Sequence, residues 1–179
     1  LDLNAPEVSG LLVQACIRGD AQAVQALLSQ GEDVNASDQQ GLTALDHALL
    51  NRQFAVAEIL SAAGGSWTRS RQDVTAVLIP AVRLNLPNLL RYALSAGADI
   101  TVTDSSARMP LHHAVLGMHH PLLQCLINPI TVAHADRFGN TPLHLAAMAS
   151  NPFAVKTLLE RQVPLNARNR DGNTALSCA

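Results

Sequence analysis

Aromatic side chains are scarce in this sequence of 179 residues. Phe, Tyr and Trp make up 3% of it, although 48% of the residues are hydrophobic. A conventional globular core contains more aromatic side chains, because each of them buries a large area. Leucine and alanine supply most of the hydrophobic content instead, and this combination suits closely packed helices. We therefore expect a mainly helical, all-α protein.

Long hydrophobic runs, an excess of one charge and paired cysteines are also missing. The sequence has no apolar stretch of about 18 residues and no basic, apolar leader, so membrane insertion is not expected. The net charge is −2, and the lack of a basic stripe or of interleaved aromatic residues argues against nucleic acid as a partner. Cys16, Cys125 and Cys178 lie far apart, which predicts free thiols in the cytoplasm or nucleus.

Motifs for catalysis and cofactor binding are absent as well. No G-x-S-x-G nucleophile turn, Cys/His signature or phosphate-binding glycine motif is present. Four of the seven histidines cluster as His112, His113, His119 and His120, but no cysteine or carboxylate lies at zinc-ligand spacing from them. We expect no enzyme activity, catalytic residue, cofactor, metal site or small-molecule substrate.

An internal repeat is the strongest feature that the sequence does contain. One column of alanines recurs every 32 or 33 residues, at Ala15, Ala48, Ala81, Ala114, Ala146 and Ala179. An apolar column with the same period contains Val34, Trp67, Ile100, Val132 and Leu165, and a glycine column contains Gly31, Gly64 and Gly97. Each unit has two helical segments, and glycine ends the second because it accepts a left-handed conformation. The unit at about residues 103–134 is one residue shorter than the others, and the missing residue lies near positions 128–129.

Residues 136–147 show the repeat in its clearest form, with the pattern D-x-x-G-x-T-P-L-H-x-A-A. This segment, with weaker versions at residues 38–48 and 109–114, resembles the ankyrin repeat, and the resemblance covers essentially the whole chain. It implies an ankyrin-repeat solenoid of about five to six stacked helix–turn–helix units with β-turn or hairpin fingers. In the family, the Thr and His of the motif tie adjacent turns together, a role that falls here to Thr141 and His144. The single array is expected to contain units at about residues 5–36, 37–69, 70–102, 103–134, 135–167 and, in part, 168–179.

Two parts of the array depart from this pattern. The unit at about residues 70–102 has Val74 in place of the turn glycine, residues 76–79 in place of Thr-Pro-Leu-His, and Pro80 beside the column alanine. We expect its first helix to begin late or to be distorted. Residues 168–179 begin a unit and stop within its first helix, and the chain does not begin with methionine. We expect a fragment of a larger protein with an exposed apolar end.

The resemblance also implies a protein-binding groove, lined by the turn tips and by the exposed side of each first helix. Position by position, the candidate partner-binding residues are Gln39, Gln40, Leu50, Asn51, Leu84, Arg108, Leu116, Arg137, Phe138, Asn140, Met148, Arg168 and Arg170. Phe138 is an aromatic residue at a tip where the fold requires none, which indicates an interface anchor. Arginine is favoured for carboxylate contacts, so the arginines of this set predict an acidic or amphipathic partner segment. Trp67 belongs to the apolar column, and we interpret it as a core residue.

We interpret the chain as a protein–protein interaction module of the kind used in scaffolds and adaptors. The alternative is a targeting or autoinhibitory domain of a larger multidomain enzyme, channel or secreted effector. Asn35 is also a candidate modification site, because its spacing from Leu27 and Asp33 resembles the pattern at which asparagine is hydroxylated in ankyrin repeats of animal proteins.

Overall fold

The computed structural model describes residues 6–68, 71–161 and 163–179, with the backbone alone at residues 6–9, 71 and 72. The helices are α1 (Pro6–Arg18), α2 (Ala21–Ser29), α3 (Ala44–Leu50), α4 (Phe54–Ala62), α5 (Arg71–Arg83), α6 (Pro87–Ser95), α7 (Pro110–Leu116), α8 (His120–Leu126), α9 (Pro129–Ala133), α10 (Pro142–Met148), α11 (Pro152–Leu159) and the 3₁₀ helix η1 (Leu176–Cys178). The described residues form no strand, and the expected all-α stack is confirmed. No described helix is long and apolar enough to cross a membrane.

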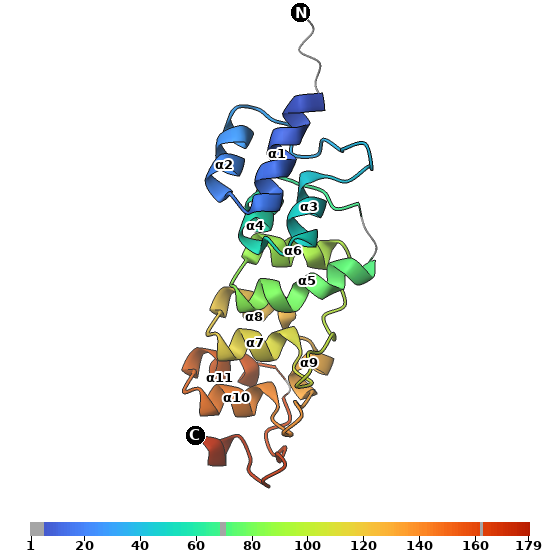
Figure 1. The fold of residues 1–179 in the computed structure, drawn as a ribbon. Coiled ribbons are helices and arrows are strands. Elements are labelled where there is room, and N and C mark those ends of the chain that lie inside the picture. Colours follow the sequence, from blue (N-terminus) through green and yellow to red (C-terminus); the bar gives the residue numbers. More distant parts are fainter. Residues whose placement is uncertain (1–5, 69–70, 162) are drawn as a thin grey trace, which may run out of the picture.

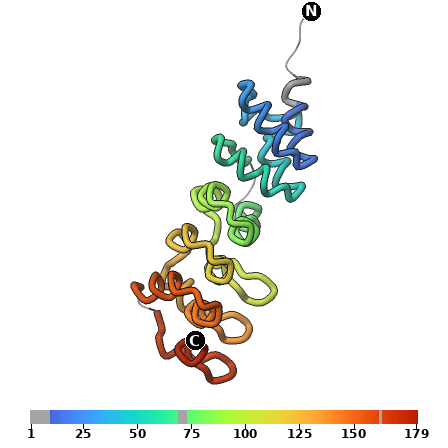
Figure 2. The backbone as a smooth tube through the Cα atoms, turned by 90° about the vertical axis from the view of Figure 1, so that its left-hand side faces the viewer, coloured from blue at the N-terminus to red at the C-terminus, as the bar shows by residue number. Residues whose placement is uncertain are grey.

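The helices form two layers that run the length of an elongated stack (Figure 1, Figure 2). The first helices of successive units pack on one another in the pairs α1–α3, α5–α7 and α7–α10. The second helices pack in the order α2, α4, α6, α8 and α11. We name α1, α3, α5, α7 and α10 the inner helices, and the second set the outer helices. Alanine, valine and leucine fill the core between the two layers.

The alanine and glycine columns have the structural roles that their residue types predict. The alanine column is buried in the inner helices from Ala15 to Ala146, because a methyl group lets neighbouring units approach closely. Gly31, Gly64 and Gly97 follow outer helices with φ angles of 91°, 85° and 83°. This left-handed conformation costs a residue with a side chain about 1 kcal/mol or more.

Four turns, which we name the fingers, precede inner helices or η1 at residues 38–42, 104–108, 136–140 and 169–173. In each finger, the amide of the first residue donates a hydrogen bond to the carbonyl of the fifth residue, and the amide of the fourth residue donates to the carbonyl of the first. The first residue is aspartate in three fingers and Asn169 in the last, and its side-chain oxygen accepts two more amide hydrogen bonds. Figure 2 shows the last three fingers projecting side by side beyond the inner helices.

The third unit has a helix where the second, fourth, fifth and sixth units have a finger, and the expectation that its first helix begins late is wrong. α5 begins early, at Arg71, and has 13 residues, against seven in α3, α7 and α10. Arg71 stands at the position of Asp38 and Asp104, and arginine cannot accept the amide hydrogen bonds of a finger. Val74 stands at the finger position that needs a left-handed backbone conformation, and this conformation is unfavourable for a β-branched residue. The segment therefore continues as helix, and Pro80 remains inside it.

The extended α5 changes how the stack packs at this point. The outer helices α4 and α6 pack closely, but the inner helices α3 and α5 barely touch, unlike the other neighbouring inner helices. In Figure 1, α1 and α3 run steeply whereas α5, α7 and α10 lie nearly level. The stack is therefore bent, and it is open on its inner side between the second and third units.

The unit that is one residue short differs on its outer side. α8 ends at Leu126 after seven residues, and the short helix α9 follows it. Asn128 begins α9, because its Oδ1 accepts hydrogen bonds from the amides of Ile130 and Thr131 at 2.9 and 2.8 Å. The hydroxyl of Thr131 donates to the carbonyl of Leu126 at 2.7 Å. These local hydrogen bonds replace the glycine turn of the other units.

Candidate partner-binding surface

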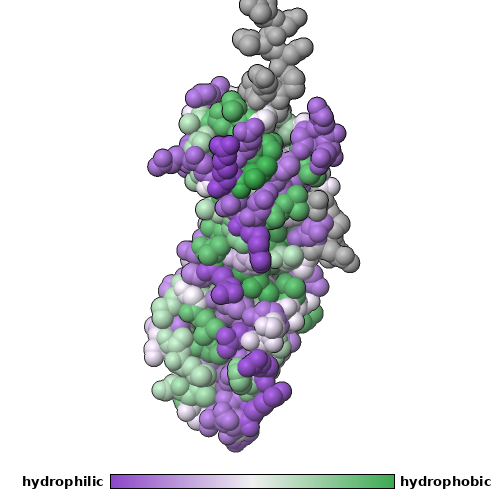
Figure 3. Space-filling model, in the orientation of Figure 1, coloured by the Kyte–Doolittle hydropathy of each residue, from purple (hydrophilic) through white to green (hydrophobic). Residues whose placement is uncertain are grey.

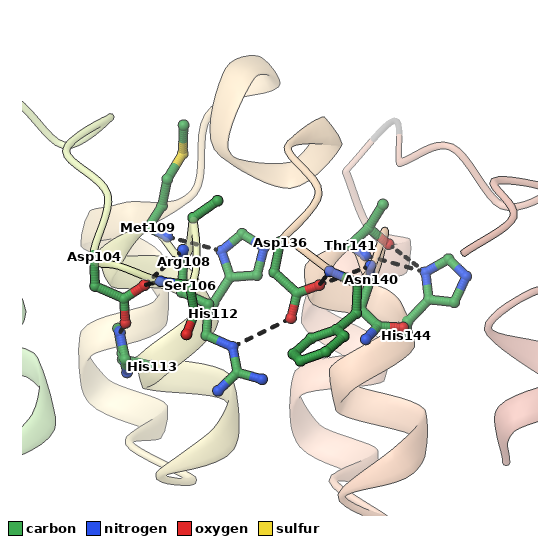
Figure 4. A network of polar contacts seen from close by, with 12 residues as sticks. Asp104, Ser106, Arg108, Met109, His112, His113, Asp136, Asn140, Thr141 and His144 are labelled. Atoms are coloured by element: carbon green, nitrogen blue, oxygen red, sulfur yellow. Dashed lines mark hydrogen bonds and ion pairs between the residues drawn. The ribbon is translucent and has the colours of Figure 1, made fainter. Parts of the chain in front are cut away.

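Asp136 is the central side chain of the finger at residues 136–140 (Figure 4). Its Oδ1 accepts hydrogen bonds from the amides of Phe138 and Asn140 at 2.9 and 3.0 Å. Its Oδ2 pairs at 3.2 Å with Nε of Arg108 from the preceding finger, and the carboxylate is fully buried. Sequence reasoning assigned Arg108 to the partner, but the fold uses this guanidinium to join two fingers. The pairing was missed because 28 residues separate the two side chains.

The last three fingers are joined into a ribbon by their backbones. The amide of Arg137 donates to the carbonyl of Ser106 at 2.9 Å, and the amide of Arg170 donates to the carbonyl of Phe138 at 3.0 Å. The ribbon consists of the three fingers at residues 104–108, 136–140 and 169–173. The finger at residues 38–42 lies apart from them, on the other side of α5 (Figure 1). The backbones of the three fingers are thus held in fixed relative positions.

Arg137 and Phe138 form one exposed pair at the middle of the ribbon. The guanidinium carbon of Arg137 lies 4.7 Å from the centroid of the Phe138 ring. Phe138 is 46% exposed, although the repeat pattern requires no aromatic residue at this position. A cation over an aromatic face restrains both side chains, so the pair presents a charge and an apolar surface together.

Asn140 does not lie on the partner-accessible surface, and its assignment to that surface is corrected. The residue is 6% exposed. Its side-chain Oδ1 accepts a hydrogen bond from Nδ2 of Asn169 at 3.0 Å, while its amide bonds Asp136. Asn140 therefore links two fingers internally, like Arg108.

The two other predicted arginines lie at the last finger, residues 169–173: Arg168 directly precedes it and Arg170 is part of it. Arg168 is exposed and donates from Nη1 to the carbonyl of Gly172 at 2.6 Å. Arg170 is exposed at the tip. With Arg137, these residues place three exposed guanidinium groups on the last two fingers.

The predicted apolar residues of the inner helices are all exposed. Leu50, Leu84, Leu116 and Met148 are 47%, 56%, 38% and 56% accessible. They stand at or next to the C-terminal ends of α3, α5, α7 and α10. Figure 3 shows hydrophobic patches, separated by hydrophilic residues, along the face that carries these helices. The four residues form an apolar row at the ends of the inner helices that lie away from the fingers.

Three polar candidates lie at the N-terminal end of the stack, away from the ribbon. Gln39 and Gln40 are exposed at the tip of the first finger. Asn51 is exposed at the end of α3, where its Nδ2 donates to the carbonyl of His47 at 2.8 Å. The nearby Asn35 bonds Ser66 and Gly64 through both ends of its amide. The predicted set therefore divides into an isolated first finger and a larger C-terminal surface.

Buried Thr and His side chains anchor the finger ribbon to the helices. The amide and hydroxyl of Thr141 donate to Nδ1 of His144 at 3.2 and 2.9 Å. Nε2 of His144 then donates to the carbonyl of Asn173 at 3.1 Å. The tie between adjacent turns that the resemblance implied for these two residues is therefore present.

Asp46 replaces that histidine in the second unit and is fully buried. Its Oδ2 accepts hydrogen bonds from the amide and hydroxyl of Thr43, at 2.7 and 2.9 Å, and from the hydroxyl of Thr68 at 2.8 Å. Its Oδ1 accepts the amide of Thr68 at 3.2 Å. Asp46 thus holds the start of α3 against the connection to the third unit.

Two of the clustered histidines, His112 and His113, form hydrogen bonds within the fold. Nδ1 of His112 accepts the amide of Met109 at 3.2 Å, and burial, with the charge of His134 adding to it, lowers the pKa of His112 to about 4. Nε2 of His113 contacts Oδ2 of Asp104 at 3.0 Å. Burial lowers the pKa of His113 more than Asp104 raises it. The described part of the chain holds no group of three or more His, Cys, Asp and Glu side chains arranged to bind a metal ion.

An apolar hollow of about 1180 Å³ lies at the C-terminal end of the stack, beside α10, α11 and η1. Leu159, Leu165 and Leu176 line it and are 52%, 56% and 87% exposed. This is the exposed apolar end that the incomplete sixth unit predicts.

Comparison with known proteins identifies similar sequences and structures. Two family models match the chain: Ankyrin repeats (many copies) over residues 12–60 and Ankyrin repeats (3 copies) over residues 78–169. The chain is 30% identical over 176 residues to the putative ankyrin repeat protein YahD of Escherichia coli, covering 92% of this chain and 86% of YahD. It is 33% identical over 138 residues to protein PhlB of Serratia liquefaciens, covering 76% of this chain but only 60% of PhlB. The crystal structure of an ankyrin repeat domain from Acinetobacter baumannii superposes with a TM-score of 0.62 at 28% identity, covering 94% of this chain and 89% of that one.

Proposed function

Because the chain belongs to the ankyrin repeat family, whose domains generally act as protein–protein interaction modules, we propose that it binds a partner protein through the C-terminal finger ribbon and through the apolar row at the other end of the inner helices. The fold typically lacks catalytic activity, and binding is the function that this surface supports. The three free cysteines support a reducing compartment, the cytoplasm or nucleus, as the place where it acts.

The exposed Arg137–Phe138 pair carries this proposal. Phe138 is 46% exposed on a ribbon whose backbone is fixed by hydrogen bonds before binding, which suits an interface anchor. Arg170 lies on the next finger and Arg168 directly before it, while the apolar row lies across the inner helices from both fingers. A partner that covers this surface removes apolar area from water and places carboxylates near the arginines.

The partner segment is expected to be acidic and amphipathic. Arg137, Arg168 and Arg170 have no carboxylate partner within ion-pair distance among the described residues. Arginine pairs with carboxylates through two parallel hydrogen bonds. The apolar side of the same segment would cover Leu116 and Met148. Such an interface weakens with added salt, because its exposed charges are screened.

Affinity capture from a lysate of the source cells, followed by mass spectrometry, tests this proposal. The test variant is Arg137→Glu with Arg170→Glu and Phe138→Ala, which leaves the ribbon backbone and the Arg108–Asp136 pair in place. The control variant is Arg91→Glu with Lys156→Glu, which reverses two exposed charges on the outer helices. Far-UV circular dichroism checks that all three proteins are equally helical.

We expect a protein that is captured by the wild type and by the control but whose recovery falls at least about tenfold with the finger variant, equivalent to about 1.4 kcal/mol of binding energy. Equal recovery by the finger variant would show that the partner uses another surface. Loss with both variants would show that charge in general, and not this surface, controls capture.

A further inference from the structure

The finger ribbon carries an arginine at the same place in two successive fingers. Arg137 is the second residue of the finger at residues 136–140, and Arg170 is the second residue of the finger at residues 169–173. The amide of Arg170 donates to the carbonyl of Phe138 at 3.0 Å. Because Phe138 follows Arg137 in the chain, this hydrogen bond limits the distance between the Cα atoms of the two arginines to about 11 Å. Packed helices lie about 8 to 10 Å apart, and stacked units repeat at the same spacing.

Phe138 occupies the ribbon between the attachment points of these two cations. Its ring centroid lies 4.7 Å from the guanidinium carbon of Arg137, and its backbone contacts that of Arg170. Phe138 is exposed, as are both arginines. The ribbon therefore presents a positive charge, an apolar side chain and a second positive charge in this order along its length.

The neighbouring carboxylates do not neutralise the two arginines. Asp136 is buried and pairs with Arg108. Asp171 is exposed at the tip of the last finger. It holds the third position, and in the two preceding fingers the carbonyl at this position bonds the next finger along, so the backbone of Asp171 faces away from Phe138. Among the described residues, no carboxylate lies within ion-pair distance of Arg137 or Arg170.

The spacing of the two arginines selects among the conformations of a partner segment with two carboxylates on one side. Side chains on one face of a β-strand are about 6.7 or about 13 Å apart, which is too short or too long. A helix provides about 10.5 Å between residues seven apart, but an isolated segment of that length is only marginally helical in water. In a polyproline II segment every third side chain shares a face, at a spacing of about 9.3 Å. Unfolded chains already populate this conformation.

We propose that the ribbon binds a polyproline II segment of the partner in which two acidic residues stand three apart with proline between them. The two carboxylates pair with Arg137 and Arg170, and a proline ring on the neighbouring edge of the segment packs on Phe138. Proline fixes the conformation before binding, which lowers the entropy cost of association. The proposal rests on the proposed function, and it specifies the partner segment as Glu-Pro-Pro-Glu or its aspartate equivalent.

Three blocked octapeptides of identical composition test the spacing. Each contains two Glu and six Pro residues, and the Glu residues are three apart in the first peptide, two apart in the second and adjacent in the third. Proton–nitrogen correlation spectra follow the amides of Arg137, Phe138 and Arg170 during titration. We expect saturable shifts in the millimolar range or below with the first peptide. The other two should bind at least about threefold more weakly, and the Gln analogue of the first about tenfold more weakly.

Two variants and a matched control assign the contacts. Arg170→Gln should remove the preference for the three-residue spacing, because only one arginine remains to pair. Phe138→Ala should weaken binding of the first peptide several-fold and keep the preference. Arg91→Gln, which removes an exposed charge on the outer helix α6, should change neither. The hydrogen bonds between fingers join main-chain groups, so all three variants retain them, and far-UV circular dichroism checks the fold.

Four results overturn the proposal. They are equal binding of the three peptides, no shift with any of them, an unchanged spacing preference in Arg170→Gln, and tighter binding of a helix-stabilised peptide with Glu residues seven apart. The last result assigns the site to a helical partner segment.

Partner capture separates this proposal from the function on which it rests. If the finger variant loses the captured partner while no peptide binds, the segment proposal alone is wrong. If the first peptide binds with the expected preference while the finger variant keeps its partner, the peptide site is correct and the captured protein uses another surface.

Discussion

Acid is expected to unfold this protein through the buried imidazole of His112. Burial, with His134 adding to it, lowers the pKa of His112 from 6.5 to about 4. The unfolded chain takes up a proton on this residue as the pH falls through 6.5, while the folded chain does so only near pH 4. Between these values the unfolded state holds the additional proton. The free energy of unfolding therefore decreases as the pH falls through this window.

The size of the effect follows from the same two pKa values. Each pKa unit corresponds to about 1.4 kcal/mol, so His112 removes about 3 kcal/mol of stability between pH 6.5 and pH 4. Asp104 affects the free energy of unfolding at pH values below this window. Burial raises the pKa of its carboxyl, but hydrogen bonds from the amides of Arg108 and Ser106 and from His113 outweigh burial and hold the pKa below 3.8. The stability that Asp104 contributes is lost only at lower pH.

Urea unfolding followed by far-UV circular dichroism, at about pH 7 and at about pH 4, measures the change. His112→Asn is the matched control, because its side-chain oxygen can still accept the amide of Met109, as Asp46 does for Thr43 in α3, but does not titrate. Wild-type stability should fall by about 3 kcal/mol more than that of the variant. Equal losses in the two proteins would refute the reasoning, as would an NMR titration of His112 with a pKa near 6.5.

Two substitutions test the energetics of the third-unit junction. Asp46→Ala should lower the free energy of unfolding by about 3 to 5 kcal/mol, because it leaves the amides of Thr43 and Thr68 without their acceptor; a loss below about 1 kcal/mol in urea unfolding contradicts this. Pro80→Ala should raise the free energy by about 1 to 3 kcal/mol by restoring the hydrogen bond to the carbonyl of Ala76; an unchanged thermal midpoint would show that the helix has already adapted to proline.

Much of the fold could be predicted from the sequence, because each repeat column reports one backbone or packing requirement. Gly31, Gly64 and Gly97 mark left-handed helix ends, and all three have positive φ angles. The spacing of Thr141 and His144 fixes a local hydrogen bond within a single helical turn. Features of this kind depend on residues that are close in the chain, and a single unit contains all the information needed.

The parts that could not be predicted depend on partners in other units. Asn140 occupies a free position in the repeat pattern, but the side chain of Asn169 turns it into an internal link. Arg108 looks like an interface cation until its partner Asp136 is known. The third unit shows a different difficulty. Its sequence reveals that a finger cannot form at Arg71 and Val74, but not that the helix extends to replace it.

The break in the finger ribbon at α5 has a consequence for how the array folds. The stability of a linear repeat protein is a sum over its units and over the interfaces between neighbours. Among the described residues, the interface between the second and third units has no hydrogen bonds between fingers and little contact between inner helices. Its coupling therefore depends on the outer layer, where α4 packs on α6 and Glu58 accepts hydrogen bonds from Asn88 and Leu89. We expect this interface to divide the array into two cooperative parts, so that residues 6–68 open while residues 71–161 remain folded and amide protons of the first two units exchange at a lower free-energy cost.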